Sequence, residues 1–170
     1  GTVNRVELVQ FSNVRSNGLR AIELNEEDTL IGVAITDGNQ QIMLFSNEGK
    51  AIRFAETDVR AMGRTAKGVR GMRVKLASST IDVEDADVEN DDSDDNDDSS
   101  DSTVVSRIVS LVVVPETGEV LCACANGYGK RTDIDDYRVT NRGGKGVKTI
   151  NITEKTGALV AIKNVTDADD

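Results

Sequence analysis

The sequence predicts an all-β, propeller-like fold made of repeated four-stranded antiparallel blades. Three observations support it: short apolar runs rich in β-branched residues, turn dipeptides between them, and phrases that recur about every 50 residues. A blade of this size cannot bury both of its faces alone, so it needs neighbours. We therefore expect a partial disc with about two complete blades and parts of two flanking ones.

The repetition is clearest in a basic phrase that contains glycine. Thr65–Met72 aligns with Gly143–Ile150. A weaker copy, Asn17–Ile22, lies about 50 residues before the part of Thr65–Met72 that it matches. A second phrase, Leu30–Val33, recurs as Ile108–Leu111 with the same offset as the basic phrase. The repeating unit is therefore about 50 residues long, and one copy carries an insertion.

Within each unit, apolar runs between turns such as Asp37-Gly38 and Asn126-Gly127 predict four short strands. In the first full unit they are Leu30–Thr36, Gln41–Ser46, Lys50–Phe54 and Val69–Leu76. In the second they are Arg107–Val114, Val120–Ala125, Lys130–Asp133 and Val147–Ile152. An earlier unit is expected to end within residues 4–24, and Ala158–Val165 is expected to begin a further one.

The chain then divides into four parts. Residues 1–77 hold the end of one blade and one full blade, 78–103 an acidic insertion, 104–165 a second full blade with the first strand of the next, and 166–170 a tail. Residues 80–102 contain 12 Asp or Glu and no Lys or Arg. Such a segment buries too little apolar surface to offset chain entropy, so we expect it to be disordered. It is a solvated linker, a segment that binds metal loosely, or a competitor of nucleic acid for basic residues.

The net charge of −10 is the sum of a strongly acidic insertion and a mildly basic remainder of the chain. Without the 12 acids of the insertion, 20 basic residues face 18 acidic ones. The folded part is therefore expected to be mildly basic.

The residue inventory argues against catalysis within this chain. There is no His, and the acids are concentrated in one run, so the usual bases and zinc ligands are nearly absent. We expect no catalytic and no metal-binding residue. Cys122 and Cys124 are expected to pack in a reducing compartment, and Tyr128 and Tyr137 to be turn and packing residues.

The sequence also indicates where the protein resides. No apolar stretch approaches the roughly 20 residues that a membrane span needs, and the amino end has no signal-peptide core. We expect a soluble, cytoplasmic protein without membrane partners. The leading Gly in place of Met leads us to expect a piece of a longer chain.

The most informative residues lie in the basic, glycine-containing loops, 63–70 and 141–148. Gly allows positive φ and lets a phosphate approach the main chain, while Lys and Arg neutralise the phosphate. Equivalent residues of successive blades would form a charged band along the rim, which suits the backbone of a DNA duplex. The candidate DNA-binding residues are Arg15, Arg20, Arg64, Lys67, Arg70, Arg73, Arg142, Lys145 and Lys148. For a single such loop, a solvated turn is the simpler interpretation.

Several long phrases resemble the C-terminal β-pinwheel domain of the DNA gyrase A subunit. They are Leu30–Val33, Ile42–Lys50, Val59–Gly63, Gly68–Gly71 and Asn126–Thr132. The resemblance covers nearly the whole chain except the acidic insertion, and the phrases are closer to gyrase than to the related, smaller C-terminal domain of the topoisomerase IV A subunit.

The resemblance implies a six-bladed β-pinwheel whose basic perimeter bends and wraps duplex DNA without sequence preference. Through it the type IIA topoisomerase would support ATP-dependent negative supercoiling, with the rest of the gyrase A subunit and the gyrase B subunit as partners. ATP and Mg²⁺ are then expected only in the holoenzyme, with no cofactor in this chain. The family's Gln-Arg-Arg-Gly-Gly-Lys-Gly box is matched only in part, by Thr140–Gly146, which keeps five of its positions. We therefore expect the true box in another blade.

Two further interpretations stay open. The chain could be a propeller-type scaffold for protein interactions with an incidental basic rim, which predicts an exposed apolar patch and a shallow salt dependence. Independently, exposed strand edges at the two ends of the arc predict possible self-association.

Overall fold

The computed structural model describes residues 1–75 and 105–169, so the predicted acidic insertion lies outside the described residues. The described part is all-β, with no α-helix. Its strands are β1 (Thr2–Val3), β2 (Gln41–Ser46), β3 (Lys50–Ala55), β4 (Val69–Arg70), β5 (Ile108–Val113), β6 (Glu119–Cys124), β7 (Gly129–Asp133), β8 (Val147–Lys148) and β9 (Leu159–Val165). Its 3-10 turns are η1 (Leu8–Phe11), η2 (Glu56–Asp58) and η3 (Ile134–Asp136).

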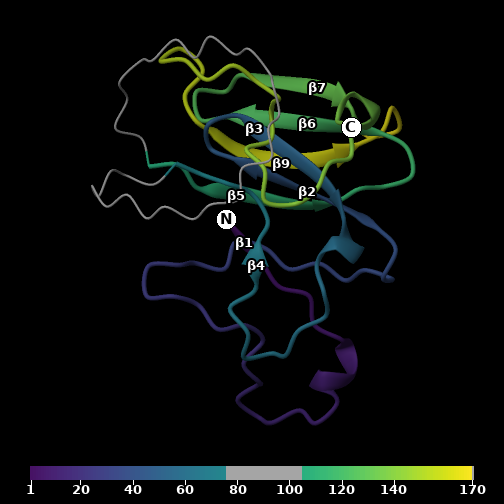
Figure 1. Cartoon of the computed structure of the whole chain (residues 1–170). Helices are drawn as coiled ribbons and strands as arrows, with labels where there is room; N and C mark the ends of the chain where they lie inside the picture. Colours follow the sequence, from purple (N-terminus) through teal and green to yellow (C-terminus); the bar gives the residue numbers. More distant parts are fainter. Residues whose placement is uncertain (76–104, 170) are drawn as a thin grey trace.

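The strands form two larger antiparallel sheets and one small pair. The first sheet has the order β5-β2-β3-β8 and the second the order β7-β6-β9, while β1 pairs with β4. In Figure 1 the two larger sheets lie together at the top, and the N-terminal segment extends away from them, below β1 and β4. The all-β, antiparallel fold class is therefore confirmed.

Each larger sheet is built on a hairpin that the sequence locates well. The hairpin β2–β3 and its counterpart β6–β7 begin at or next to the predicted positions. Their glycines Gly49 and Gly127 have φ of 75° and 83°, which a tight turn with a left-handed residue requires. Each hairpin also receives a third strand with the same irregularity, after Phe45 in β2 and after Ala123 in β6. The repeat is therefore structural as well as sequential.

The composition of the sheets differs from the expectation that one unit forms one blade. Strand β5, which the sequence assigns to the second unit, pairs with β2 of the first, and β8 of the second unit pairs with β3. In the same way β9 pairs with the preceding hairpin through β6. Successive units are therefore joined by exchanged strands, which places hydrogen bonds across the boundary between units.

One predicted strand is wrong and two are much shorter than expected. Leu30–Thr36 is irregular, and the side chains of Leu30 and Val33 are exposed. Its counterparts β5 and β9 each pair with the hairpin that precedes them, and the described residues before Leu30 contain no hairpin. An apolar β-branched run without such a partner cannot satisfy its backbone as a strand. The predicted strands from Val69 and from Val147 form only two residues each.

The first sheet is covered on both faces. Met43 and Phe45 of β2 pack against the second sheet together with Val120, Cys122 and Tyr137. The alternate residues of β2 lie in another cluster with side chains that follow β3. Because successive strand residues point to opposite faces, this double cover explains why β2 is a continuous apolar run.

Candidate nucleic-acid interface

The basic loops of successive units are tied to one another by arginine side chains. Nη1 of Arg64 donates to the carbonyl of Arg20 at 2.9 Å, and Nη1 of Arg142 donates to the carbonyl of Arg70 at 3.0 Å. Arg64 and Arg142 occupy the same position in the alignment of the two loops, so equivalent residues make the same bond twice. Each loop is therefore held against the loop of the preceding unit.

Backbone hydrogen bonds extend the junction between loop 63–70 and loop 141–148. The amide of Gly143 donates to the carbonyl of Gly71 at 2.7 Å, and the amide of Arg73 donates to the carbonyl of Gly144 at 2.8 Å. Nε of Arg142 donates to the carbonyl of Asp58 at 3.0 Å. This places loop 141–148 directly beside residues 70–73. At the other junction the amide of Glu23 donates to Ala66 at 3.2 Å, which holds the segment after Arg20 beside loop 63–70.

The predicted residues therefore separate into two groups. Arg64 and Arg142 are partly buried, and their guanidinium groups donate hydrogen bonds to backbone carbonyls. These two side chains therefore stabilise the junctions between loops. The others have exposed side chains, and no described residue makes a hydrogen bond or an ion pair with the charged groups of those side chains. These exposed cations are Arg15, Arg20, Lys67, Arg70, Arg73, Lys145 and Lys148. We call them the basic band.

Glycine has a packing role in these loops. Gly68 and Gly146 have φ of 90° and 75°, where a residue with a side chain is strained. A Cβ at Gly68 would collide with the carbonyl of Val3, and one at Gly146 with the carbonyl of Ala51. The space at these two glycines is filled by a strand of the preceding unit, so it is not left open for a phosphate.

A second arginine pair was missed by the sequence reasoning. Nη1 of Arg5 donates to the carbonyls of Glu56 and Val59 at 3.4 and 3.2 Å. Nη1 of Arg53 donates to the carbonyls of Ile134 and Tyr137 at 2.7 and 3.0 Å. Arg5 therefore binds the turn η2, and Arg53 binds the turn η3, so each arginine holds the 3-10 turn of the following unit. The signal was available, because Arg5 precedes Arg53 by close to one repeat length.

The cysteines and Tyr137 are packing residues. Cys122, Cys124 and Tyr137 are buried, and the Tyr137 hydroxyl shares a hydrogen bond with Thr149. Burial raises the pKa of the Cys122 thiol and of the Tyr137 hydroxyl, while the hydrogen bonds to Thr149 act in the opposite direction. A raised pKa keeps both groups neutral, as expected of groups that only fill the core. Tyr128 differs, because its ring is exposed with Lys155 Nζ 5.3 Å from its centroid.

Within residues 1–75 and 105–169, no three His, Cys, Asp or Glu side chains come together as a metal site would require. In the same part of the chain, no helix has the length and hydrophobicity needed to cross a bilayer.

Comparison with known sequences agrees with the repeat and the fold. The model of a family described as "DNA gyrase C-terminal domain, beta-propeller" matches residues 1–37, 40–78 and 118–166. The DNA gyrase A subunit of Haemophilus influenzae is 47% identical over 169 residues, covering 99% of this chain and 19% of that protein. The DNA gyrase A subunit of Pseudomonas aeruginosa is 40% identical over 171 residues, covering 100% of this chain and 15% of that protein. The chain thus spans less than a fifth of these relatives.

Solved structures show the same fold. A structure of the DNA gyrase A C-terminal domain superposes with a TM-score of 0.73 at 24% identity, covering 98% of this chain and 46% of that one. A crystal structure of the C-terminal domain of DNA topoisomerase IV gives a TM-score of 0.76 at 22% identity, covering 99% of this chain and 44% of that one. The family match extends over most of the residues, so the resemblance stated from the sequence is confirmed. The chain belongs to the family of DNA gyrase C-terminal domains.

Proposed function

We propose that this chain binds duplex DNA without sequence preference along the basic band, and bends or wraps it. As part of the A subunit of DNA gyrase, a type IIA topoisomerase of the cytoplasm, it would support negative supercoiling by the holoenzyme. The rest of the gyrase A subunit and the gyrase B subunit would be its protein partners, and ATP and Mg²⁺ would act in those other parts. The chain itself would carry no catalytic step.

One observation carries the proposal: the basic loops of successive units are joined directly. The bonds from Arg64 to Arg20 and from Arg142 to Arg70 hold neighbouring loops in contact. The remaining cations of the loops are exposed, so they can approach phosphates without first breaking a bond to the described residues. A row of cations along a curved edge is the arrangement that a bent duplex backbone needs.

The absence of sequence preference follows from the chemistry of the band. Lys and Arg on turns contact phosphate oxygens, which are the same at every base pair. Candidate stacking residues are few, since the whole chain has three Phe, two Tyr and no Trp. Single-stranded DNA, which proteins hold by stacking, is therefore expected to bind less well than duplex.

The test is a titration of duplex DNA over a range of salt concentrations. Each phosphate neutralised contributes a slope of about −0.9 to the plot of log affinity against log salt. A variant with Lys67, Arg70, Lys145 and Lys148 changed to Glu should lose binding while its far-ultraviolet spectrum stays that of the wild type. The matched control changes four exposed cations outside the loops to Glu: Arg107, Arg138, Lys155 and Lys163.

The outcome distinguishes the two functions considered from the sequence. Equal affinity of the two variants would contradict the proposal, as would binding that is insensitive to salt. A protein-interaction scaffold has one observation in its favour, because Leu8, Val9, Val14, Leu30 and Val33 are exposed in the N-terminal segment.

A further inference from the structure

The first sheet places a lysine directly beside a cation of the basic band. Lys50 is the first residue of β3, and Lys148, a member of the basic band, is the last residue of β8. The register of the two strands sets these lysines opposite each other. Opposite residues of an antiparallel pair point to the same face of the sheet, with Cβ atoms about 5 Å apart. Both lysines therefore project from one face at the edge of the sheet, where β8 is the last strand.

The charges of these two lysines are not neutralised in the described part of the chain. Lys50 is partly buried and Lys148 is exposed, and no described residue makes a hydrogen bond or an ion pair with either ammonium group. Like charges directly opposite each other in a sheet are unfavourable. The fold does not require them, because β1 and β4 pair in the equivalent register with Thr2 opposite Arg70. An anion bound between the lysines would replace the repulsion by attraction.

The Lys50 ammonium group is not used to join two units. Lys130 follows the hairpin glycine of the second unit as Lys50 follows that of the first. The Nζ atom of Lys130 donates to the carbonyl of Thr149 at 3.4 Å. Gly71 aligns with Thr149, but its carbonyl accepts the amide of Gly143 at 2.7 Å. The bond made by Lys130 is therefore not repeated by Lys50, whose charge is available for a ligand.

The surroundings of the lysine pair are complete within the described residues. The first sheet has all four strands, and residues 70–73 of the preceding unit lie beside loop 141–148, which leads into β8. Arg70 is the counterpart of Lys148 in the alignment of the loops. Its side chain is exposed although the loop of the next unit is bonded to its carbonyl. A further unit bonded after β8 would therefore leave the Lys148 side chain exposed in the same way.

We propose that Lys50 and Lys148 form a clamp that binds one phosphate group of a duplex DNA backbone. The clamp rests on the proposed function and deepens it, because it extends the basic band by one strand into the sheet. A lysine ammonium is a compact charge on a flexible stem. Two stems that start about 5 Å apart can therefore bring both charges to oxygens of the same phosphate.

The test is a titration of the whole chain with duplex DNA at several salt concentrations. Lys50→Met keeps the unbranched stem and removes the charge. It should weaken binding about threefold or more at about 50 mM salt and make the dependence on salt shallower. The matched control, Lys163→Met, removes an exposed lysine outside the loops and should bind like the wild type. Lys50→Arg keeps the charge and should retain most of the affinity.

The stability of the chain without DNA separates a phosphate contact from a structural role. Lys50→Met removes the repulsion from Lys148, so its midpoint in urea denaturation should equal or exceed that of the wild type. A lower midpoint would show that the Lys50 charge supports the sheet, and it would overturn the proposal.

Coupling between the two lysines tests whether they share one phosphate. Either single loss disables a clamp, so Lys50→Met together with Lys148→Met should weaken binding by less than the product of the two single effects. Lys50→Met together with Lys67→Met, which lies in the other basic loop, should give the full product. A full product for the Lys50 and Lys148 pair would contradict a shared phosphate.

Failure of the clamp can be distinguished from failure of the proposed function. A wild-type chain that does not bind duplex DNA, or binds it without dependence on salt, overturns the proposed function and the clamp with it. If the wild type binds with the expected dependence on salt and Lys50→Met binds as tightly as Lys163→Met, the clamp alone is wrong.

Discussion

The two larger sheets start from similar hairpins and end in different environments. The hairpin β2–β3 has an outer strand beside each of its two strands, and β2 is buried on both faces, whereas the hairpin β6–β7 has a third strand only beside β6. The burial pattern of β6 alternates, with Val120 and Cys122 buried and Leu121 partly exposed. The comparison teaches that a blade of this kind is completed by its neighbours, which supply strands, a 3-10 turn and a second layer of core.

The largest expected contrast comes from truncating the paired residues Met43 and Leu121. Met43→Ala removes a fully buried side chain between the sheets and should lower the free energy of unfolding by about 2–5 kcal/mol. Leu121→Ala removes a partly exposed one and should cost less than about 1 kcal/mol. Urea denaturation of both variants measures the difference. Similar losses would show that the second sheet is covered in solution.

The hairpin glycines give the next contrast. Both have positive φ, but a Cβ at Gly49 would collide with the carbonyl of Ile150, whereas one at Gly127 meets nothing within 4 Å. Gly127→Ala should therefore cost only the backbone strain, about 1 kcal/mol, and Gly49→Ala about 2 kcal/mol or more. Thermal unfolding of the two variants under the same conditions measures both losses of stability. An equal loss would mean that Ile150 and Ile152 move away from the new side chain without a cost in stability.

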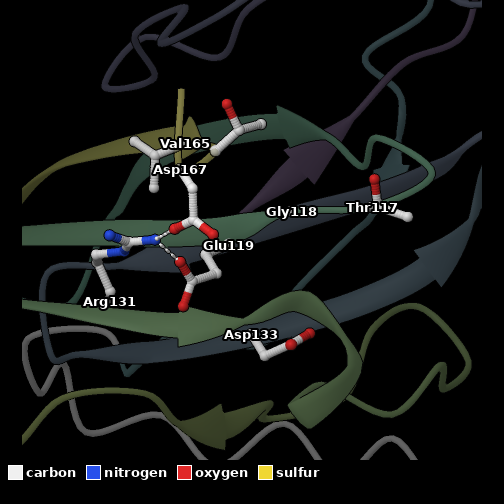
Figure 2. Close-up of a pocket in the computed structure, with 8 residues that line it drawn as sticks. Thr117, Gly118, Glu119, Arg131, Asp133, Val165 and Asp167 are labelled. Atoms are coloured by element: carbon white, nitrogen blue, oxygen red, sulfur yellow. Dashed lines mark hydrogen bonds and ion pairs between the residues drawn. The ribbon is translucent and has the colours of Figure 1, made fainter. Parts of the chain in front are cut away.

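The arginine pair tests the turn contact itself. Arg53→Ala removes the guanidinium that donates to the carbonyls of Ile134 and Tyr137, which should cost about 1–3 kcal/mol. Arg131 aligns with Arg53 in the second unit, and its guanidinium pairs with two carboxylates instead (Figure 2). Arg131→Ala removes two exposed ion pairs and should leave the stability nearly unchanged, because exposed pairs contribute little. Both are measured by urea denaturation. A large loss in Arg131→Ala would contradict the comparison.

The smallest expected effect is a dependence of the unfolding free energy on pH that comes from Cys122 and Tyr137 in the second unit. In the alignment of the two units, Tyr137 and Cys122 occupy the places of Val59 and Leu44, which do not titrate. Burial raises the pKa of both titratable groups, so the unfolded chain loses these protons first as the pH rises. Stability should therefore fall as the pH rises from about 8, where the unfolded thiol begins to lose its proton, to above about 10, where the unfolded phenol does so. Tyr137→Phe should show a shallower fall, measured as the change in unfolding free energy over this interval. If the unfolding free energy of Tyr137→Phe fell with pH as steeply as that of the wild type, the assignment of the pH dependence to Tyr137 would be wrong.

Local features were read correctly because their causes are local. The hairpins β2–β3 and β6–β7 depend on turn residues and on β-branched runs that lie close together in the sequence. The repeat offset also identified the two loops that the structure holds side by side. Arg64 and Arg142 were assigned to DNA, and the structure places their guanidinium groups on carbonyls of the preceding loop. Nothing in a single loop reveals that use, because the partner is 44 or 72 residues away.

The amino-acid sequence by itself determined the all-β class, the unit of about 50 residues, the hairpins and the repeated basic loops. Only the tertiary structure decided which unit each outer strand joins, and it left Leu30–Thr36 irregular although its sequence is that of a strand. The physical reason is that a hairpin forms from its own turn, while an outer strand forms only against a partner edge that satisfies its backbone. The same rule separates Arg53, which is held by the following unit, from Arg131, which faces solvent.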